Sequence, residues 1–172
     1  MTRLILSVIP SLALAQALPS RRWTEIENHL RHTPETLYVL NFWSTWCRPC
    51  IAELPHLQAA YHKLKSTLPV QFWLISLDLP PDGAYKAAQL LRQKHISLPA
   101  FWLSENDPNT WIPRLNPEWD GAIPYTHLGL TPIGHPHAFS SPQEVEDFVK
   151  RGYDAMGNPF RQPPADWRQG GR

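Results

Sequence analysis

The sequence has very little cysteine: Cys47 and Cys50 are the only two among 172 residues, with two residues between them. A small scaffold held together by disulfides needs more cysteines at longer separations, so that class is excluded. A structural zinc site needs four ligands. The chain has no second pair of this spacing, and its only closely spaced histidines are His135 and His137. The two cysteines are therefore expected to act together as a pair.

The chain also lacks an excess of charge of either sign. Its 16 lysines and arginines nearly balance 15 aspartates and glutamates, which gives a formal charge of +1. Residues 1–17 contain Arg3 and no acid, so without them the charge would be zero. Nucleic acids and anionic membranes attract basic patches. We therefore expect no nucleic-acid partner and no electrostatic binding to a membrane.

One apolar stretch stands at the N-terminus. In residues 1–17, MTRLILSVIPSLALAQA, a single arginine precedes an apolar segment and two overlapping Ala-x-Ala sites. This pattern predicts a secretory signal peptide cleaved after Ala15 or Ala17. A spanning helix needs about 20 apolar residues. A buried N-terminal core helix and an uncleaved membrane anchor are the alternatives, and only the anchor would bring the protein to a membrane. Export would place the cysteines in an oxidising compartment.

The rest of the chain, 42% hydrophobic and 18% charged overall, predicts one α/β domain. Apolar residues at helical spacing indicate helices, and β-branched or aromatic runs indicate strands. The predicted helices are 22–32, about 51–66, 84–95 and 141–151, with one short helix inside 104–120; the predicted strands are 36–43, 70–77, 99–103, 125–130 and 135–140. The first strands should pair in parallel, and the closing hairpin should add an antiparallel edge.

The ends of two helices carry capping signals. Thr24 is the expected N-cap of the first helix, and Ser141 that of the last, with Glu144 as its capping-box partner. The tail, 153–172, is rich in proline, glycine and arginine. This composition predicts a poorly ordered segment.

The segment Cys47-Arg48-Pro49-Cys50 stands between a buried strand and a helix. Backbone N–H groups and the helix dipole favour an anion at this place, so the pKa of the Cys47 thiol should fall below its usual value of about 8.5. Arg48 adds positive charge beside it. A thiolate with a second thiol one turn away supports thiol–disulfide exchange. A structural disulfide over four residues would contribute only about 2 kcal/mol, and it remains an alternative, as does a metal site.

Two segments carry a resemblance to a known family. The run from Val39 to Cys50, continued by Glu53-Leu54-Pro55, resembles the active-site segment of thioredoxin-like proteins, and more narrowly the TlpA/ResA branch of bacterial envelope thioredoxins. The run from Gly121 to Thr126 resembles the loop that carries a cis-proline in that family. The resemblance covers roughly 23–152, with 82–103 as the branch's central helix-strand insert. It implies a thioredoxin-like fold for a domain spanning 22–152.

The resemblance also implies roles for residues. Cys47 corresponds to the exposed nucleophile and Cys50 to the buried resolving thiol, the two forming a redox-active disulfide. Pro124 corresponds to the cis-proline, and the backbone of Ile123 would pair with an extended substrate. Trp46 would shape the docking surface, with a plain core aromatic as the alternative.

Asn41 and Glu53 distinguish this chain from cytosolic thioredoxins, which carry an aspartate at the position of Asn41. An amide cannot serve as a general base. In the branch a glutamate at the place of Glu53 sits behind the disulfide, where burial would raise its pKa. We expect Glu53 to relay the proton of Cys50; a solvated first-turn glutamate is the alternative.

These observations predict a thiol:disulfide oxidoreductase that needs no cofactor and no metal. The branch implies a periplasmic reductant acting on disulfide-containing exported proteins, often in cytochrome c maturation, with a membrane thiol transporter as electron donor. Two alternatives remain open: an oxidase that donates its disulfide, and a copper-binding module using Cys47, Cys50 and His127. His56 is expected to be an ordinary histidine. A peroxidase would need a cysteine signature that the sequence lacks.

Overall fold

A computed structural model describes residues 16–105 and 107–155. Its elements are β1 (Ser20–Arg21), α1 (Trp23–His32), β2 (Leu37–Trp43), α2 (Arg48–Leu64), β3 (Val70–Ser76), α3 (Gly83–Gln93), β4 (Ala100–Leu103), a 3-10 helix (Pro108–Thr110), α4 (Ile112–Leu115), β5 (Tyr125–Leu128), β6 (Gly134–His135) and α5 (Pro142–Ala155). The six strands form one mixed sheet in the order β1-β4-β3-β2-β5-β6. This confirms the predicted α/β class.

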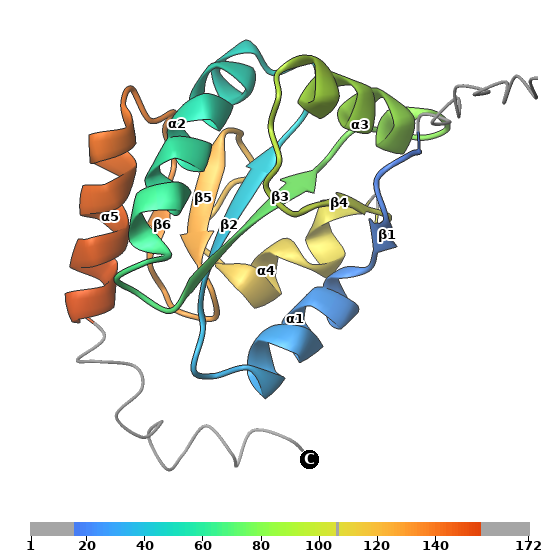
Figure 1. Ribbon diagram of the computed structural model, residues 1–172. Coiled ribbons are helices and arrows are strands. Elements are labelled where there is room, and N and C mark those ends of the chain that lie inside the picture. Colours follow the sequence, from blue (N-terminus) through green and yellow to red (C-terminus); the bar gives the residue numbers. More distant parts are fainter. Residues whose placement is uncertain (1–15, 106, 156–172) are drawn as a thin grey trace, which may run out of the picture.

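Helices cover both faces of the sheet (Figure 1). One hydrophobic cluster joins α2, α3 and α5 to one face, and a second cluster joins α1 and α4 to the other. In the part of the chain that the structure describes, no helix is both long enough and apolar enough to cross a membrane.

Strand β2 lies at the centre and is buried along its whole length. It pairs in parallel with β3 and antiparallel with β5, as the expected hairpin edge requires. Successive side chains of a strand point to opposite faces. Val39 therefore belongs to the cluster under α2, whereas Leu40 and Phe42 belong to the cluster under α1.

The N-cap prediction is confirmed for Ser141 and wrong for Thr24, and the predicted capping box of Ser141 does not form. The backbone N–H of Glu144 donates to Ser141 Oγ at 3.2 Å, as a cap should, but the Glu144 carboxylate accepts from the backbone and hydroxyl of Ser140 instead of closing the box on Ser141. The N-cap of α1 is Arg22 and not Thr24, because Glu25 Oε2 already accepts the backbone N–H of Arg22 at 2.7 Å.

Several boundaries also differ from the predictions. Strand β1 was not expected; it forms because Ser20 and Arg21 pair with the edge strand β4. Strand β6 has two residues, and the chain leaves the sheet after His135. Helix α5 continues through Ala155, four residues beyond its predicted end and into the predicted tail. The remaining tail, and most of the predicted signal peptide, lie outside the described residues.

Candidate active site

The two cysteines form a disulfide where β2 ends and α2 begins. The Cys47–Cys50 bond is 2.05 Å long, and the two Cα atoms are 5.3 Å apart. Cys47 is the N-cap of α2 and keeps a small exposed surface, whereas Cys50 is fully buried one turn into the helix. Only Cys47 is thus within reach of another protein.

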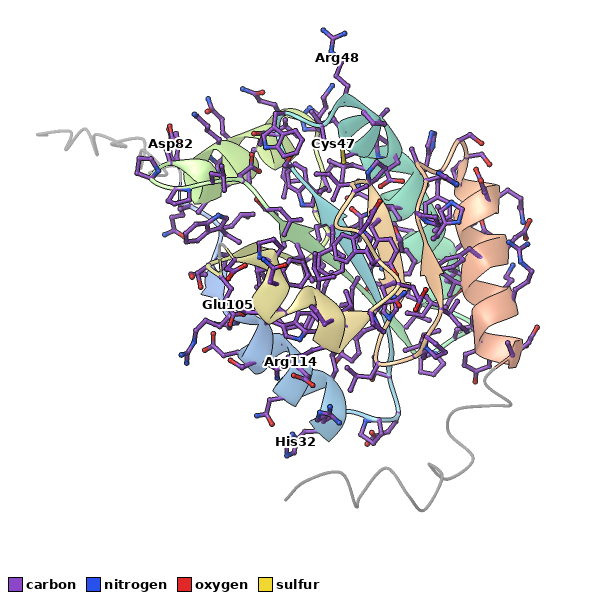
Figure 2. The ribbon with its side chains drawn as sticks, turned by 180° about the vertical axis from the view of Figure 1, so that it is seen from behind. His32, Cys47, Arg48, Asp82, Glu105 and Arg114 are labelled. Atoms are coloured by element: carbon purple, nitrogen blue, oxygen red, sulfur yellow. A yellow bond between two sulfur atoms is a disulfide. The ribbon has the colours of Figure 1, made fainter. Side chains whose placement is uncertain are left out.

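Backbone groups surround the Cys47 sulfur. The N–H of Cys50 donates to Cys47 Sγ at 3.3 Å. On reduction, this donor and the positive end of the α2 dipole would favour a thiolate. Arg48, which we expected to add positive charge, is exposed and extends outward from the start of α2 (Figure 2). Because solvent screens such a charge, we assign the stabilisation to the backbone.

The predicted cis-proline loop faces the disulfide. The Ile123–Pro124 bond is cis, which confirms that expectation. The Ile123 carbonyl oxygen lies 3.8 Å from Cys47 Sγ, close enough to contact it. In the disulfide Cys47 carries no thiol proton, so this approach is a contact and not a hydrogen bond.

Glu53 lies fully buried beneath the cysteines, on the face of α2 turned to the sheet. Its Oε1 accepts from Asn41 Nδ2 at 2.8 Å, and its Oε2 accepts the backbone N–H of Phe139 at 2.9 Å. Burial raises the pKa of Glu53 from 4.5 to about 7, and these two hydrogen bonds only partly offset it. The solvated-glutamate alternative is therefore wrong.

Asn41 holds the Glu53 carboxylate in position. Its Nδ2 also donates to Thr126 Oγ1 at 2.9 Å, so the amide joins Glu53 on α2 to strand β5. Among the described residues, its Oδ1 is buried and has no hydrogen-bond partner. An amide can offer its N–H to an ionised carboxyl or, once flipped, its oxygen to a protonated one. The pair can therefore accommodate both states of Glu53.

Asp78 holds the turn that presents Cys47, a role that the sequence did not reveal. This nearly buried carboxylate accepts from the backbone N–H of Thr45 at 3.0 Å and also from its hydroxyl. Ser76 Oγ donates to its second oxygen at 2.8 Å. Asp78 follows β3, the parallel neighbour of β2. One signal in the sequence could have revealed this role. The first strands are predicted to be parallel, so the residues that follow them should lie at the same edge of the sheet.

Trp46 is 68% exposed, which excludes the core alternative. It lines a hollow of about 450 Å³ beside the disulfide, and Ile123 lines the same hollow. The other walls come from the stretch after β3, from Leu103 of β4 and from the segment between β4 and β5, for which the sequence predicted no role.

The structure does not support the copper alternative. His127 is fully buried; its Nε2 lies 2.6 Å from the Thr131 carbonyl, and its Nδ1 lies 3.0 Å from Tyr125 Oη. A carbonyl only accepts, so Nε2 carries the proton and Nδ1 accepts from the tyrosine. Both ring nitrogens are engaged, on the face of β5 opposite to Thr126 and the thiols. Within the described ranges, no three His, Cys, Asp or Glu side chains form a metal-binding group.

His56 belongs to α2 and is half-buried, as expected of an ordinary histidine. The site assembled by the structure thus consists of the disulfide, Glu53 with Asn41, and the Ile123–Pro124 loop. Asp78 and the Phe139 backbone join it from segments that the sequence did not connect with the cysteines, and Thr126 joins it from the end of the predicted proline loop.

Comparison with known proteins identifies a family and several similar proteins. The AhpC/TSA family model matches residues 17–107. A curated thiol-disulfide oxidoreductase, ResA of Oceanobacillus iheyensis, is 48% identical over 40 residues, which are 23% of this chain and 20% of that protein. The match therefore spans about a fifth of the relative's length.

Solved structures show the same fold. A thiol:disulfide interchange protein of the thioredoxin family from Chlorobium tepidum aligns with a TM-score of 0.57 and 19% identity, over 81% of this chain and 98% of that one. A secreted thiol-disulfide isomerase from Corynebacterium glutamicum gives 0.56 and 17%, over 73% and 75%. StoA from Bacillus subtilis gives 0.53 and 17%, over 67% and 83%. The fold is thioredoxin-like.

Proposed function

Because this chain belongs to the AhpC/TSA family and carries a CxxC disulfide at a helix N-terminus, we propose that it is a thiol:disulfide oxidoreductase. The observation that carries the proposal is the asymmetry of the pair. Cys47 caps α2, accepts a backbone N–H and reaches the surface, while Cys50 is fully buried behind it. This asymmetry is what an attacking and a resolving thiol require.

The reaction starts from the reduced dithiol. The Cys47 thiolate attacks one sulfur of a client disulfide, that bond breaks, and the other client sulfur leaves as a thiolate with the electron pair. The Cys50 thiol then passes its proton to the Glu53 carboxylate and attacks Cys47 Sγ. The mixed disulfide breaks, the second client thiolate leaves, and the Cys47–Cys50 disulfide forms. Two electrons have moved to the client, and an external dithiol must return them.

Glu53 suits the proton transfer because of its environment. A group transfers protons best when its pKa lies near the working pH. The pKa of about 7 meets this condition. The hydrogen bonds from Asn41 and the Phe139 backbone hold the carboxyl in place on the helical face of Cys50, one turn further along.

We further propose that the protein acts as a reductant on disulfide-containing exported proteins in the periplasm. The predicted signal peptide supports export, and one structural relative is described as secreted. A membrane thiol transporter would supply the electrons, and cytochrome c maturation is one process that the resemblance implies. The substrate-contacting groups would be Trp46, the Ile123 backbone and Pro124.

Trapping of mixed disulfides tests the proposal. Cys50→Ser should accumulate complexes with client proteins that dithiothreitol releases, because its Cys47 can attack but nothing resolves the product. Cys47→Ser is the matched control and should trap little. Equal trapping by both variants would show that the assignment of the two roles is wrong. Failure of the reduced wild-type protein to reduce either insulin or hydroxyethyl disulfide would remove the activity itself.

A further inference from the structure

The hollow beside the disulfide has walls from separate parts of the chain. Trp46 and Ile123 flank the cysteines, Leu79 follows β3, and Trp111, Ile112 and Trp119 come from the segment between β4 and β5. Its volume of about 450 Å³ is enough for a large side chain with part of its backbone. Leu79 is 67% exposed and Trp46 is 68% exposed, so apolar surface faces solvent at the mouth. Exposed apolar surface of this kind marks binding sites.

The charge of the hollow has one sign. Among the described residues that line it, Glu105 and Asp120 are the two that ionise, and both are acids. Glu105 accepts the backbone N–H of Trp23 through Oε2, and Asp120 accepts that of Ala122 through Oδ1 at 2.9 Å. Each of these bonds uses one carboxylate oxygen and leaves the charge in place. Figure 2 shows Glu105 on the flank between Cys47 and the His32 end of α1.

Two residues that line the hollow are neighbours of the reacting sulfur. Trp46 directly precedes Cys47, and the Ile123 carbonyl is 3.8 Å from Cys47 Sγ. A polypeptide bonded to Cys47 must pass this loop. An extended chain advances about 3.3 Å per residue, so residues two to four positions from the client cysteine would reach the hollow.

We propose that the hollow selects clients that carry an aromatic or large aliphatic side chain beside a lysine or arginine, close to the reacting cysteine. The apolar walls take the large side chain, and Glu105 and Asp120 attract the cation. This inference rests on the proposed oxidoreductase function and adds a client class to it. The occupant is an extended segment of another protein.

Peptide kinetics test this selection. Each probe is a short peptide with one cysteine blocked as a mixed disulfide with thionitrobenzoate, and the pre-reduced protein releases the coloured thiol. The reference peptide has Phe and Lys within four residues of the cysteine. Replacing Phe by Ala should lower the second-order rate constant about tenfold. Replacing Lys by Glu should lower it about three- to fivefold at low salt and less at high salt.

Variants locate the effect in the hollow. In Glu105→Gln/Asp120→Asn, the side-chain oxygens can still accept the two backbone N–H groups, so the fold is retained while the charge is lost. This variant should react with the Lys and Glu peptides with equal second-order rate constants. Leu79→Ser, at an exposed position, should erase the preference for Phe. Glu118→Gln, an exposed acid of the same segment outside the hollow, is the matched control and should behave as wild type.

The small disulfide separates two kinds of failure. Hydroxyethyl disulfide is too small to fill the hollow, so all these variants should reduce it at the wild-type rate. Equal rates for every peptide, with hydroxyethyl disulfide still reduced, would overturn the client class and leave the enzyme. No reaction with either substrate would overturn the proposed function. A concentration-dependent dimer that Leu79→Ser dissociates would assign the hollow to a second copy and overturn the inference.

Discussion

At the scale of single residues, Glu53 is an ionisable group with no contact to solvent. Its burial disfavours the charged form, and the donors from Asn41 and Phe139 recover only part of the lost hydration. Asn41 cannot take a proton, so the acid–base function that we propose falls to Glu53. Full burial at neutral pH is tolerable because a pKa of about 7 keeps part of the carboxyl population protonated there.

Replacing Glu53 by Gln should slow the resolving step. The amide keeps an acceptor for the Asn41 or Phe139 donor but cannot take the proton of Cys50. We expect about a 100-fold loss in the rate of mixed-disulfide resolution near pH 7. Stopped-flow kinetics from pH 5 to 9 would measure it, and the inflection near pH 7 should vanish. An unchanged profile would remove Glu53 from the mechanism.

At the scale of elements, the end of β3 supports the start of α2. Asp78 receives the Thr45 backbone and hydroxyl donors, and its own carbonyl accepts Trp102 Nε1 at 2.6 Å from β4. Adjacent strand ends thus fix the turn that delivers Cys47. The active-site turn is held by the edge of the sheet and not by α2 alone.

Removing one hydrogen-bond donor to Asp78 should destabilise the protein. Thr45→Val keeps the shape and loses the hydroxyl bond to a carboxylate, which costs about 2 kcal/mol in the free energy of unfolding. Asp78→Ala should lower the free energy of unfolding further, because it leaves the donors of Thr45 and Ser76 without their acceptor. Urea denaturation of the oxidised proteins would measure both, and the double variant should cost less than the sum. Simple additivity would show that the two groups do not interact.

Helix α5 packs so closely on β5 that a methyl group does not fit at Gly152. A Cβ there would lie 2.1 Å from Leu128 Cδ1, in a fully buried contact. Ala in a helix is favoured over Gly by about 1 kcal/mol, whereas overpacking costs about 1–3 kcal/mol. We expect Gly152→Ala to destabilise the protein in thermal unfolding. Adding Leu128→Ala should relieve the overlap, so the second change should cost less in the Gly152→Ala background than in wild type.

At the scale of the whole molecule, two buried ionisable groups on opposite faces of the sheet respond to pH in opposite senses. Burial raises the pKa of Glu53 from 4.5 to about 7 and lowers that of His127 from 6.5 to about 4. The folded state therefore holds the Glu53 proton more tightly than the unfolded state does, and it takes up a His127 proton less readily. Because of Glu53, the free energy of unfolding falls as the pH rises from 4.5 to 7. Because of His127, it falls as the pH decreases from 6.5 to 4.

Single variants should separate the two contributions. Relative to wild type, oxidised Glu53→Gln should gain about 3 kcal/mol of unfolding free energy between pH 4.5 and 7. His127→Gln should gain a similar amount relative to wild type as the pH falls from 6.5 to 4. Chemical denaturation across this range would measure both. Differences that do not vary with pH would show that neither group titrates as its burial implies.

Local patterns in the sequence were enough for much of the fold. The buried run of β2, the helical spacing in α2 and the cysteine at its N-cap follow from side-chain periodicity and capping within a few residues. They were enough to predict the disulfide pair, the α/β class and, with the family resemblance, the cis-proline loop. Strand β1 escaped prediction, and β6 is shorter than the predicted strand at 135–140, because two residues form a strand only when a partner strand lies beside them.

What the sequence by itself determined was the local chemistry: two thiols at the start of a helix and a glutamate one turn further on. Only the tertiary structure decided which groups surround them, because those contacts join distant residues. The Phe139 N–H that meets Glu53 is 86 positions away, and Thr45 is 33 positions from Asp78. Strand register turned His127 away from the thiols, and chain packing placed Glu105 and Asp120 around the hollow. Such encounters depend on the sheet order, which periodicity does not encode.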